Sequence, residues 1–91
     1  MITAIVLIHA EAARIPETAQ ALADLDGVTE VYSCAGDVDL IAVVRVRDHD
    51  RIAEVVTGRI NKTPGVLRTD THIAFKSYSS ADTEAGFSIG E

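Results

Sequence analysis

Two short polar segments interrupt an otherwise aliphatic chain, and they carry the side chains best suited to bind a small molecule. The first runs from Gly36 through Asp37 and Val38 to Asp39. Gly36 can adopt a positive φ and let a ligand approach the backbone closely. Loop N–H groups can hold a carboxylate, while Asp37 or Asp39 can hold an ammonium group. Glycine and aspartate are also the ordinary residues of turns, so composition alone favours a plain hairpin turn.

The second polar segment is Thr69-Asp70-Thr71, which falls in a predicted strand. Alternation along a strand places the two hydroxyls on one face and the carboxylate on the other. Such a segment can form one wall of a polar ligand site. Taken alone, it is more typical of an edge strand with a solvated face, because threonine favours strands in any case.

The other reactive side chains do not form a pattern that indicates catalysis. His9, His49 and His72 lack the spacing of a metal site, and Cys34 has no evident base beside it, so a buried and inert thiol is expected. We therefore predict no catalytic residues, no metal and no cofactor. Four arginines, two in a predicted strand and two in a predicted helix, are interpreted as solvated charges: Arg45, Arg47, Arg51 and Arg59.

Hydrophobic patterning predicts six elements that would position these segments. Aliphatic runs indicate strands over residues 2–9, 28–35 and 39–47, and a longer, half-polar strand over 66–78. Residues 15–25 read as a helix with Pro16 in its first turn. A second helix begins after Asp48, a favourable N-cap, and carries an apolar stripe formed by Ile52, Val55, Val56 and Ile60.

The order of these elements is β-α-β-β-α-β, which predicts an α+β fold of the ferredoxin-like sandwich type. Residues 1–78 would form one domain, with an antiparallel sheet and both helices on one face, and 79–91 a tail with a short extra strand as an option. The uncovered face would expose an apolar patch to water. Such patches mark interfaces, so we expect a homodimer packed through Ile5, Leu7, Ile41 and Val43.

Charge and length restrict the function further. The chain has 91 residues and a formal net charge of −6, from 8 basic and 14 acidic residues. Direct binding to nucleic acid is not expected, because it requires lysines and arginines at the phosphates. No apolar run reaches the ~18 residues of a membrane span, and the start lacks the basic residues of a secretory signal. With Cys34 as the single cysteine, a cytoplasmic location is expected.

The two polar segments also carry a family resemblance. Val31-x4-Gly36-Asp37-Val38-Asp39-Leu40, followed by an aliphatic strand, resembles the strand-turn-strand signature of the Lrp/AsnC effector domain, also called the RAM domain. The run Ile60-Asn61-Lys62-Thr63-Pro64-Gly65-Val66-x2-Thr69-x-Thr71 resembles that family's second signature. The resemblance covers residues 2–78. Two features depart from the family: a strand begins at Ile2, where full-length members carry a helix-turn-helix domain, and Val38 stands where many members have an aromatic residue.

The resemblance implies a stand-alone effector-binding module. Its dimers would join into larger rings and would bind a small effector, usually an amino acid, between dimers. Residues carried over to that cleft are Gly36, Asp37, Asp39, Thr69 and Thr71, with Asp70 as a weaker candidate. A full-length Lrp/AsnC-type regulator is an implied partner through co-assembly, and the missing helix-turn-helix agrees with the absence of direct DNA binding.

Two other functions remain open from the sequence. Ferredoxin-like dimers also build small oxygenases and isomerases, which need an enclosed pocket with convergent acid and base groups. A cavity lined by His9, His72 or Tyr32 would favour that alternative. The second is an assembly domain that binds no ligand.

Overall fold

The computed structural model describes residues 1–80 and contains strands and helices in the predicted order. The strands are β1 (Ile2–Ala10), β2 (Val28–Ser33), β3 (Leu40–Val46) and β4 (Val66–Ile73). A 3₁₀ turn, η1 (Ala12–Arg14), leads into α1 (Ile15–Ala23). The second helix, α2 (His49–Val55), continues into a π-helical turn, η2 (Val56–Ile60).

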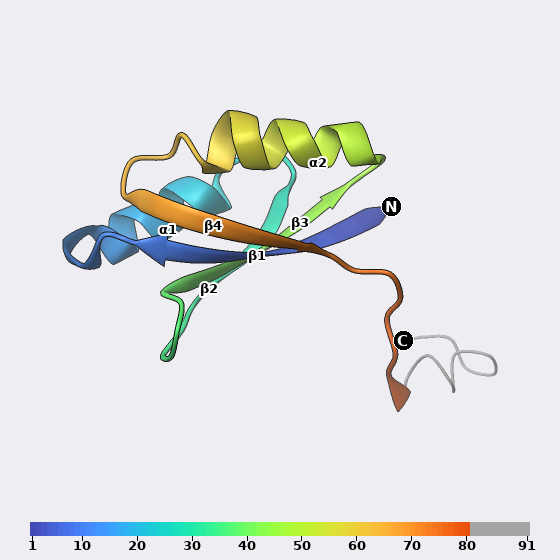
Figure 1. Cartoon of the computed structure of the whole chain (residues 1–91), viewed down its shortest axis with the longest axis horizontal. Coiled ribbons are helices and arrows are strands. Elements are labelled where there is room, and N and C mark those ends of the chain that lie inside the picture. Colours follow the sequence, from blue (N-terminus) through green and yellow to red (C-terminus); the bar gives the residue numbers. More distant parts are fainter. Residues whose placement is uncertain (81–91) are drawn as a thin grey trace.

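The sheet has the order β2-β3-β1-β4 and all its pairs are antiparallel. Figure 1 shows α1 and α2 on the same side of this sheet. The α+β ferredoxin-like prediction is therefore confirmed. β1 and β3 are central, and central strands are typically apolar on both faces, as these two are.

The core lies between the helices and one face of the sheet. Alternate residues of the two central strands point into it, and the stripe of the second helix packs against them. Asp48 caps α2, because its carboxylate accepts a 3.0 Å hydrogen bond from the Arg51 N–H. The fully buried side chains of this core are mostly aliphatic: Val6, Ile8, Leu22, Leu40, Val44 and Ile60.

The opposite, open face of the sheet carries the predicted apolar patch. Ile5 pairs with Val43 and Leu7 pairs with Ile41 across the two central strands. Ile5, Leu7 and Ile41 are half-buried, but Val43 is only 8% exposed within the single chain. We expected Val43 to face water with the others, and this expectation is corrected. Val43 lies between Ile5 on β1 and Glu30 on β2, which flank it.

Several boundaries differ from the sequence prediction. β4 ends at Ile73 and not at residue 78, and α1 ends at Ala23. The connection between β2 and β3 covers residues 34–39, longer than the tight turn expected at Gly36-Asp37. Beyond β4, the chain leaves the sheet (Figure 1), with Phe75 fully exposed and Tyr78 largely so. The extra strand considered for the tail falls almost wholly outside the described residues.

Candidate functional site

The predicted ligand turn lies at the exposed connection between β2 and β3. Gly36 has a φ of 131°, a conformation that side-chain-bearing residues rarely adopt. A Cβ added there would meet nothing within 4 Å. The glycine is thus favoured by backbone conformation and not by crowding, and the space around the turn is free for another molecule.

Asp39 fixes this turn to the end of β1. Its carboxylate accepts a 2.8 Å hydrogen bond from the Ala10 N–H, and its own N–H donates to the Ile8 carbonyl at 3.0 Å. Its carbonyl accepts from the Cys34 N–H at 2.9 Å, which closes the loop. Asp39 therefore positions the turn, and its carboxylate is already in use within the chain.

Asp37 has a different environment. Its side chain is exposed, and within residues 1–80 no hydrogen bond or ion pair involves its carboxylate. The two aspartates of the turn are therefore not equivalent: Asp39 anchors it, and Asp37 is available to an external cation.

The Thr69-Asp70-Thr71 segment splits between the two faces of the sheet. Thr69 and Thr71 pair with the core-facing positions Ile8 and Val6 of β1, so both hydroxyls lie on the helix side of the edge strand. Thr69 donates a 2.7 Å hydrogen bond to the Asn61 side chain. Asp70 lies on the open face, 3.4 Å from the His72 ring nitrogen.

The turn and the threonine pair do not meet in one chain. Leu40, which follows the turn, pairs with Ile8 of β1, and Ile8 pairs on its other side with Thr69. The two segments thus lie at the same end of the sheet but are separated by β1, roughly 10 Å apart at two strand spacings. A ligand held by both segments would need a second chain to close the site.

The Pro64-Gly65 junction is a structural joint that the sequence did not reveal. The Thr18 hydroxyl of α1 donates a 3.0 Å hydrogen bond to the Pro64 carbonyl, and the Glu11 N–H donates to the Gly65 carbonyl at 2.8 Å. Gly65 has a φ of 96°, and a Cβ there would collide with the Thr18 side chain. The second signature therefore holds β4 against α1 and the end of β1.

Tyr32 and Glu30 form a polar pair on the open face of β2. The Tyr32 hydroxyl donates a 2.9 Å hydrogen bond to the Glu30 carboxylate. That bond, followed by the negative charge of Glu30, raises the pKa of Tyr32 above its usual 10.0, while Arg45 opposes the shift. Tyr32 is half exposed, so the pair is a surface feature and not an enclosed acid–base centre.

Two cavities open at the end of the sheet away from Gly36, and Met1 and Arg45 line both of them. One lies at the far end of β3 from Gly36, and the other lies on the open face beside residues 74–77. Neither is lined by His9, His72 or Tyr32. Within residues 1–80, no three His, Cys, Asp or Glu side chains gather as a metal site would need, and no helix is long and apolar enough to span a membrane.

The fold and the paired signatures define an effector-domain architecture, and comparison with known proteins identifies the family. The sequence-family model of the Lrp/AsnC ligand binding domain matches residues 3–83 of this chain. The chain therefore belongs to the Lrp/AsnC family, through its ligand-binding domain. A curated relative, the HTH-type transcriptional regulator FL11 of Pyrococcus horikoshii, is 29% identical over 75 residues, which are 82% of this chain and 49% of that regulator. The chain thus spans about half the length of this relative, and 39% of a second regulator from the same organism.

Solved structures show the same architecture. The crystal structure of TTHA0845 from Thermus thermophilus is 44% identical, with a TM-score of 0.81, over 87% of this chain and 99% of that one. Escherichia coli AsnC is 25% identical, with a TM-score of 0.78, over 84% of this chain and 52% of AsnC. A feast or famine regulatory protein from M. tuberculosis, complexed with L-methionine, is 27% identical over 88% of this chain and 54% of its own, with a TM-score of 0.70.

Proposed function

We propose that this chain binds an amino acid as an effector and couples its binding to self-assembly, in the service of transcriptional regulation. The observation that carries the proposal is the turn at Gly36-Asp37. It is exposed, it is anchored to β1 through Asp39, and it presents in Asp37 a carboxylate without a partner in residues 1–80. The L-methionine complex of a family relative supports an amino acid as the ligand class.

The chemistry of the turn suits a free amino acid. The ligand's ammonium group would pair with Asp37, and its carboxylate would accept hydrogen bonds from loop N–H groups around Gly36. Thr69 and Thr71 of another chain would supply the polar wall, because β1 separates them from the turn within one chain. No covalent chemistry takes place, and we assign no catalytic residue.

Assembly would use the open face of the sheet. Its half-buried centre, formed by Ile5, Leu7 and Ile41, is a continuous apolar strip on neighbouring strands. Phe75, which lines the open-face cavity together with Ile5, adds exposed aromatic area; a buried aromatic side chain removes roughly 150–250 Å² from water. We propose a sheet-packed homodimer on this basis, with dimers joining into a ring around the effector.

The module would act on regulation without gripping DNA itself. With a net charge of −6, the chain as a whole is repelled by the extended phosphate backbone of DNA. We propose that it acts in the cytoplasm and conveys the effector signal by co-assembly with a full-length Lrp/AsnC-type regulator. The curated relatives are transcriptional regulators, and a regulator with the same sheet surface would offer this chain a matching face for co-assembly.

A thermal-shift screen of the twenty amino acids, beginning with L-methionine, tests the proposal. A ligand at 100 times its Kd adds about 2.7 kcal/mol to native stability by mass action. Calorimetry then compares the wild type with Asp37→Ala and with the control Asp24→Ala. Asp24 is an exposed residue at the C-terminal end of α1, and its carboxylate accepts a hydrogen bond from the Gln20 side-chain amide on the protein surface.

Asp37→Ala is expected to weaken amino-acid binding by about 1.5–3 kcal/mol, the range for a hydrogen bond to a charged group. Asp24→Ala should leave the binding free energy unchanged. If none of the twenty amino acids stabilises the wild type, the ligand-free assembly domain becomes the better account. If an amino acid binds but both variants retain its affinity, Asp37 is not part of the site.

A further inference from the structure

A cavity of about 220 Å³ opens at the end of β3 opposite to the Gly36 turn. It lies between the end of β3, the turn before β2 and the first turns of α2. The seven residues of β3 separate it from the Gly36 end by roughly 20 Å, at about 3.3 Å per residue. Its lining consists of Met1, Asp26, Gly27, Arg45, Val46, Arg47 and Arg51.

Three of the eight basic residues of an acidic chain line this one cavity. The sequence pattern favoured solvated charges for Arg45, Arg47 and Arg51, and the fold places all three residues in the lining of this cavity, with Arg45 also lining the adjoining cavity on the open face. Within residues 1–80, no carboxylate lies within 4.0 Å of the Arg45 or Arg47 guanidinium group. Their charge is therefore available to an external anion.

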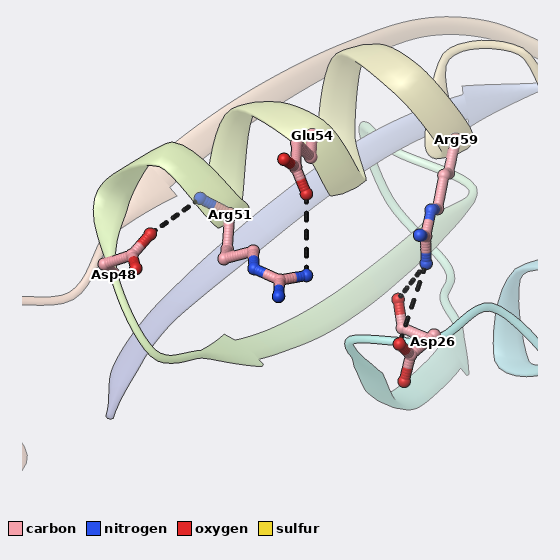
Figure 2. Close-up of polar contacts among 5 residues, drawn as sticks. All are labelled: Asp26, Asp48, Arg51, Glu54 and Arg59. Atoms are coloured by element: carbon pink, nitrogen blue, oxygen red, sulfur yellow. Dashed lines mark hydrogen bonds and ion pairs between the residues drawn. The ribbon is translucent and has the colours of Figure 1, made fainter.

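The neighbouring carboxylates have other partners, as Figure 2 shows. The Asp26 carboxylate lies 3.9 Å from the Arg59 guanidinium group. The same guanidinium group donates a 3.2 Å hydrogen bond to the Asp26 backbone carbonyl. The Asp48 carboxylate accepts a hydrogen bond from the Arg51 backbone N–H, and the Glu54 carboxylate lies 3.6 Å from the Arg51 guanidinium group. The Arg51–Glu54 pair is exposed at both ends, and exposed pairs of this kind are weak. Arg51 can therefore turn to a more highly charged ligand.

We propose that this cavity binds a small phosphorylated molecule, as a second ligand site of the chain. Guanidinium groups match phosphate oxygens with paired hydrogen bonds, and a lining that includes three arginines suits a ligand of two or more negative charges. The volume admits a phosphate or pyrophosphate group with a few further atoms and is below that of a typical drug-sized pocket. Val46 adds an apolar wall for that remainder.

The ligand would be a free molecule and not a polyanion or a membrane surface. The whole chain carries a net charge of −6, which repels an extended anionic surface at long range. A small anion that enters the cavity meets the arginines together with one acidic lining residue, Asp26, which is paired with Arg59. The site is distinct from the amino-acid turn, because none of its lining residues belongs to residues 34–39.

Calorimetric titration of the full chain with inorganic phosphate and with pyrophosphate, at low ionic strength, tests this site. Pyrophosphate should bind, and at least tenfold more tightly than phosphate. Arg47→Gln and Arg51→Gln should each weaken the affinity for pyrophosphate at least fivefold. The matched control is Arg14→Gln, an exposed arginine beside Glu11 in the turn before α1, which should leave the affinity unchanged. Circular dichroism confirms that each variant is folded.

Asp37→Ala separates this site from the amino-acid site: it should leave pyrophosphate binding intact, and Arg47→Gln should leave amino-acid binding intact. The proposal is overturned if 10 mM pyrophosphate (about the weakest affinity of interest, a Kd in the mM range) gives no binding heat. It is equally overturned if Arg14→Gln weakens pyrophosphate as much as Arg47→Gln does, or if the arginine variants alter only the oligomeric state.

Discussion

Replacing Gly65 by alanine tests the joint that holds β4 to α1. The added Cβ would collide with the Thr18 hydroxyl and approach the Thr18 Cβ to 3.3 Å. Thr18 cannot swing into solvent, because it is 1% exposed and donates its hydroxyl to the Pro64 carbonyl at 3.0 Å. Either that hydrogen bond breaks or the loop moves, and movement of the loop disturbs the 2.8 Å bond from the Glu11 N–H to the Gly65 carbonyl.

The expected cost has two parts. An L residue at a φ of 96° is strained by about 1–3 kcal/mol. Losing a hydrogen bond within a packed joint adds about 1–3 kcal/mol, so Gly65→Ala should lower the free energy of unfolding by about 2–6 kcal/mol. That is a large share of the roughly 5–15 kcal/mol that stabilises a domain of ordinary size.

Gly36→Ala is the matched control, because Gly36 also has a positive φ but open space around it. It carries the strain cost without the collision, so it should destabilise by about 1–3 kcal/mol. Urea unfolding at one fixed protein concentration measures both variants, since self-association would make the midpoint depend on concentration. Equal stability losses in the two variants would refute the packing argument for Gly65.

Three further predictions concern other contacts. Asp39→Ala should destabilise by about 1–3 kcal/mol in urea unfolding, because the Ala10 N–H loses its acceptor, while Asp39→Asn, which retains an acceptor oxygen, should cost less. Leu7→Glu should prevent self-association in sedimentation experiments, since it would bury an unpaired charge, whereas Ala53→Glu on the exposed side of α2 should not; dimers in both variants would remove the open face from the interface. Because the pKa of Tyr32 is raised in the fold, the contribution of its protonated hydroxyl to stability should be complete below pH 10 and should be lost as the pH rises beyond that value. Glu30→Gln removes the cause of the shift, so phenolate absorbance, measured in a Tyr78→Phe background, should give a lower pKa for Tyr32 in this variant.

Much of the fold followed from hydrophobic patterning alone. The aliphatic runs in residues 2–9 and 39–47 identified the two central strands, and the stripe through Ile52 and Ile60 identified α2. These signals are strong because strands buried on both faces are almost wholly apolar, while a helix on a core shows one apolar stripe. The end of β4 was missed because Phe75 and Tyr78 have aromatic side chains that favour strands. Whether they join a sheet depends on a neighbouring strand, which the local sequence does not show.

The candidate site was harder to predict because its residues have local roles that composition conceals. Asp37 and Asp39 are chemically identical and two positions apart, and only the register of β1 against β3 shows that Asp39 is held by Ala10. The Pro64-Gly65 joint depends on Thr18, 46 positions away from Pro64. The presence of Arg45, Arg47 and Arg51 in the lining of one cavity likewise depends on how β3 meets α2, which no short motif encodes.

The central claim is that effector binding and self-assembly are coupled, and sedimentation equilibrium across an amino-acid titration tests it most directly. Linkage requires that if the ligand site is completed between chains, ligand and assembly strengthen each other by the same factor. With L-methionine, or whichever of the twenty amino acids stabilises the chain, we predict a dimer at micromolar concentration without ligand and a shift to larger assemblies as ligand is added. A monomer at that concentration, or an assembly state that does not change while the amino acid binds, would contradict the account.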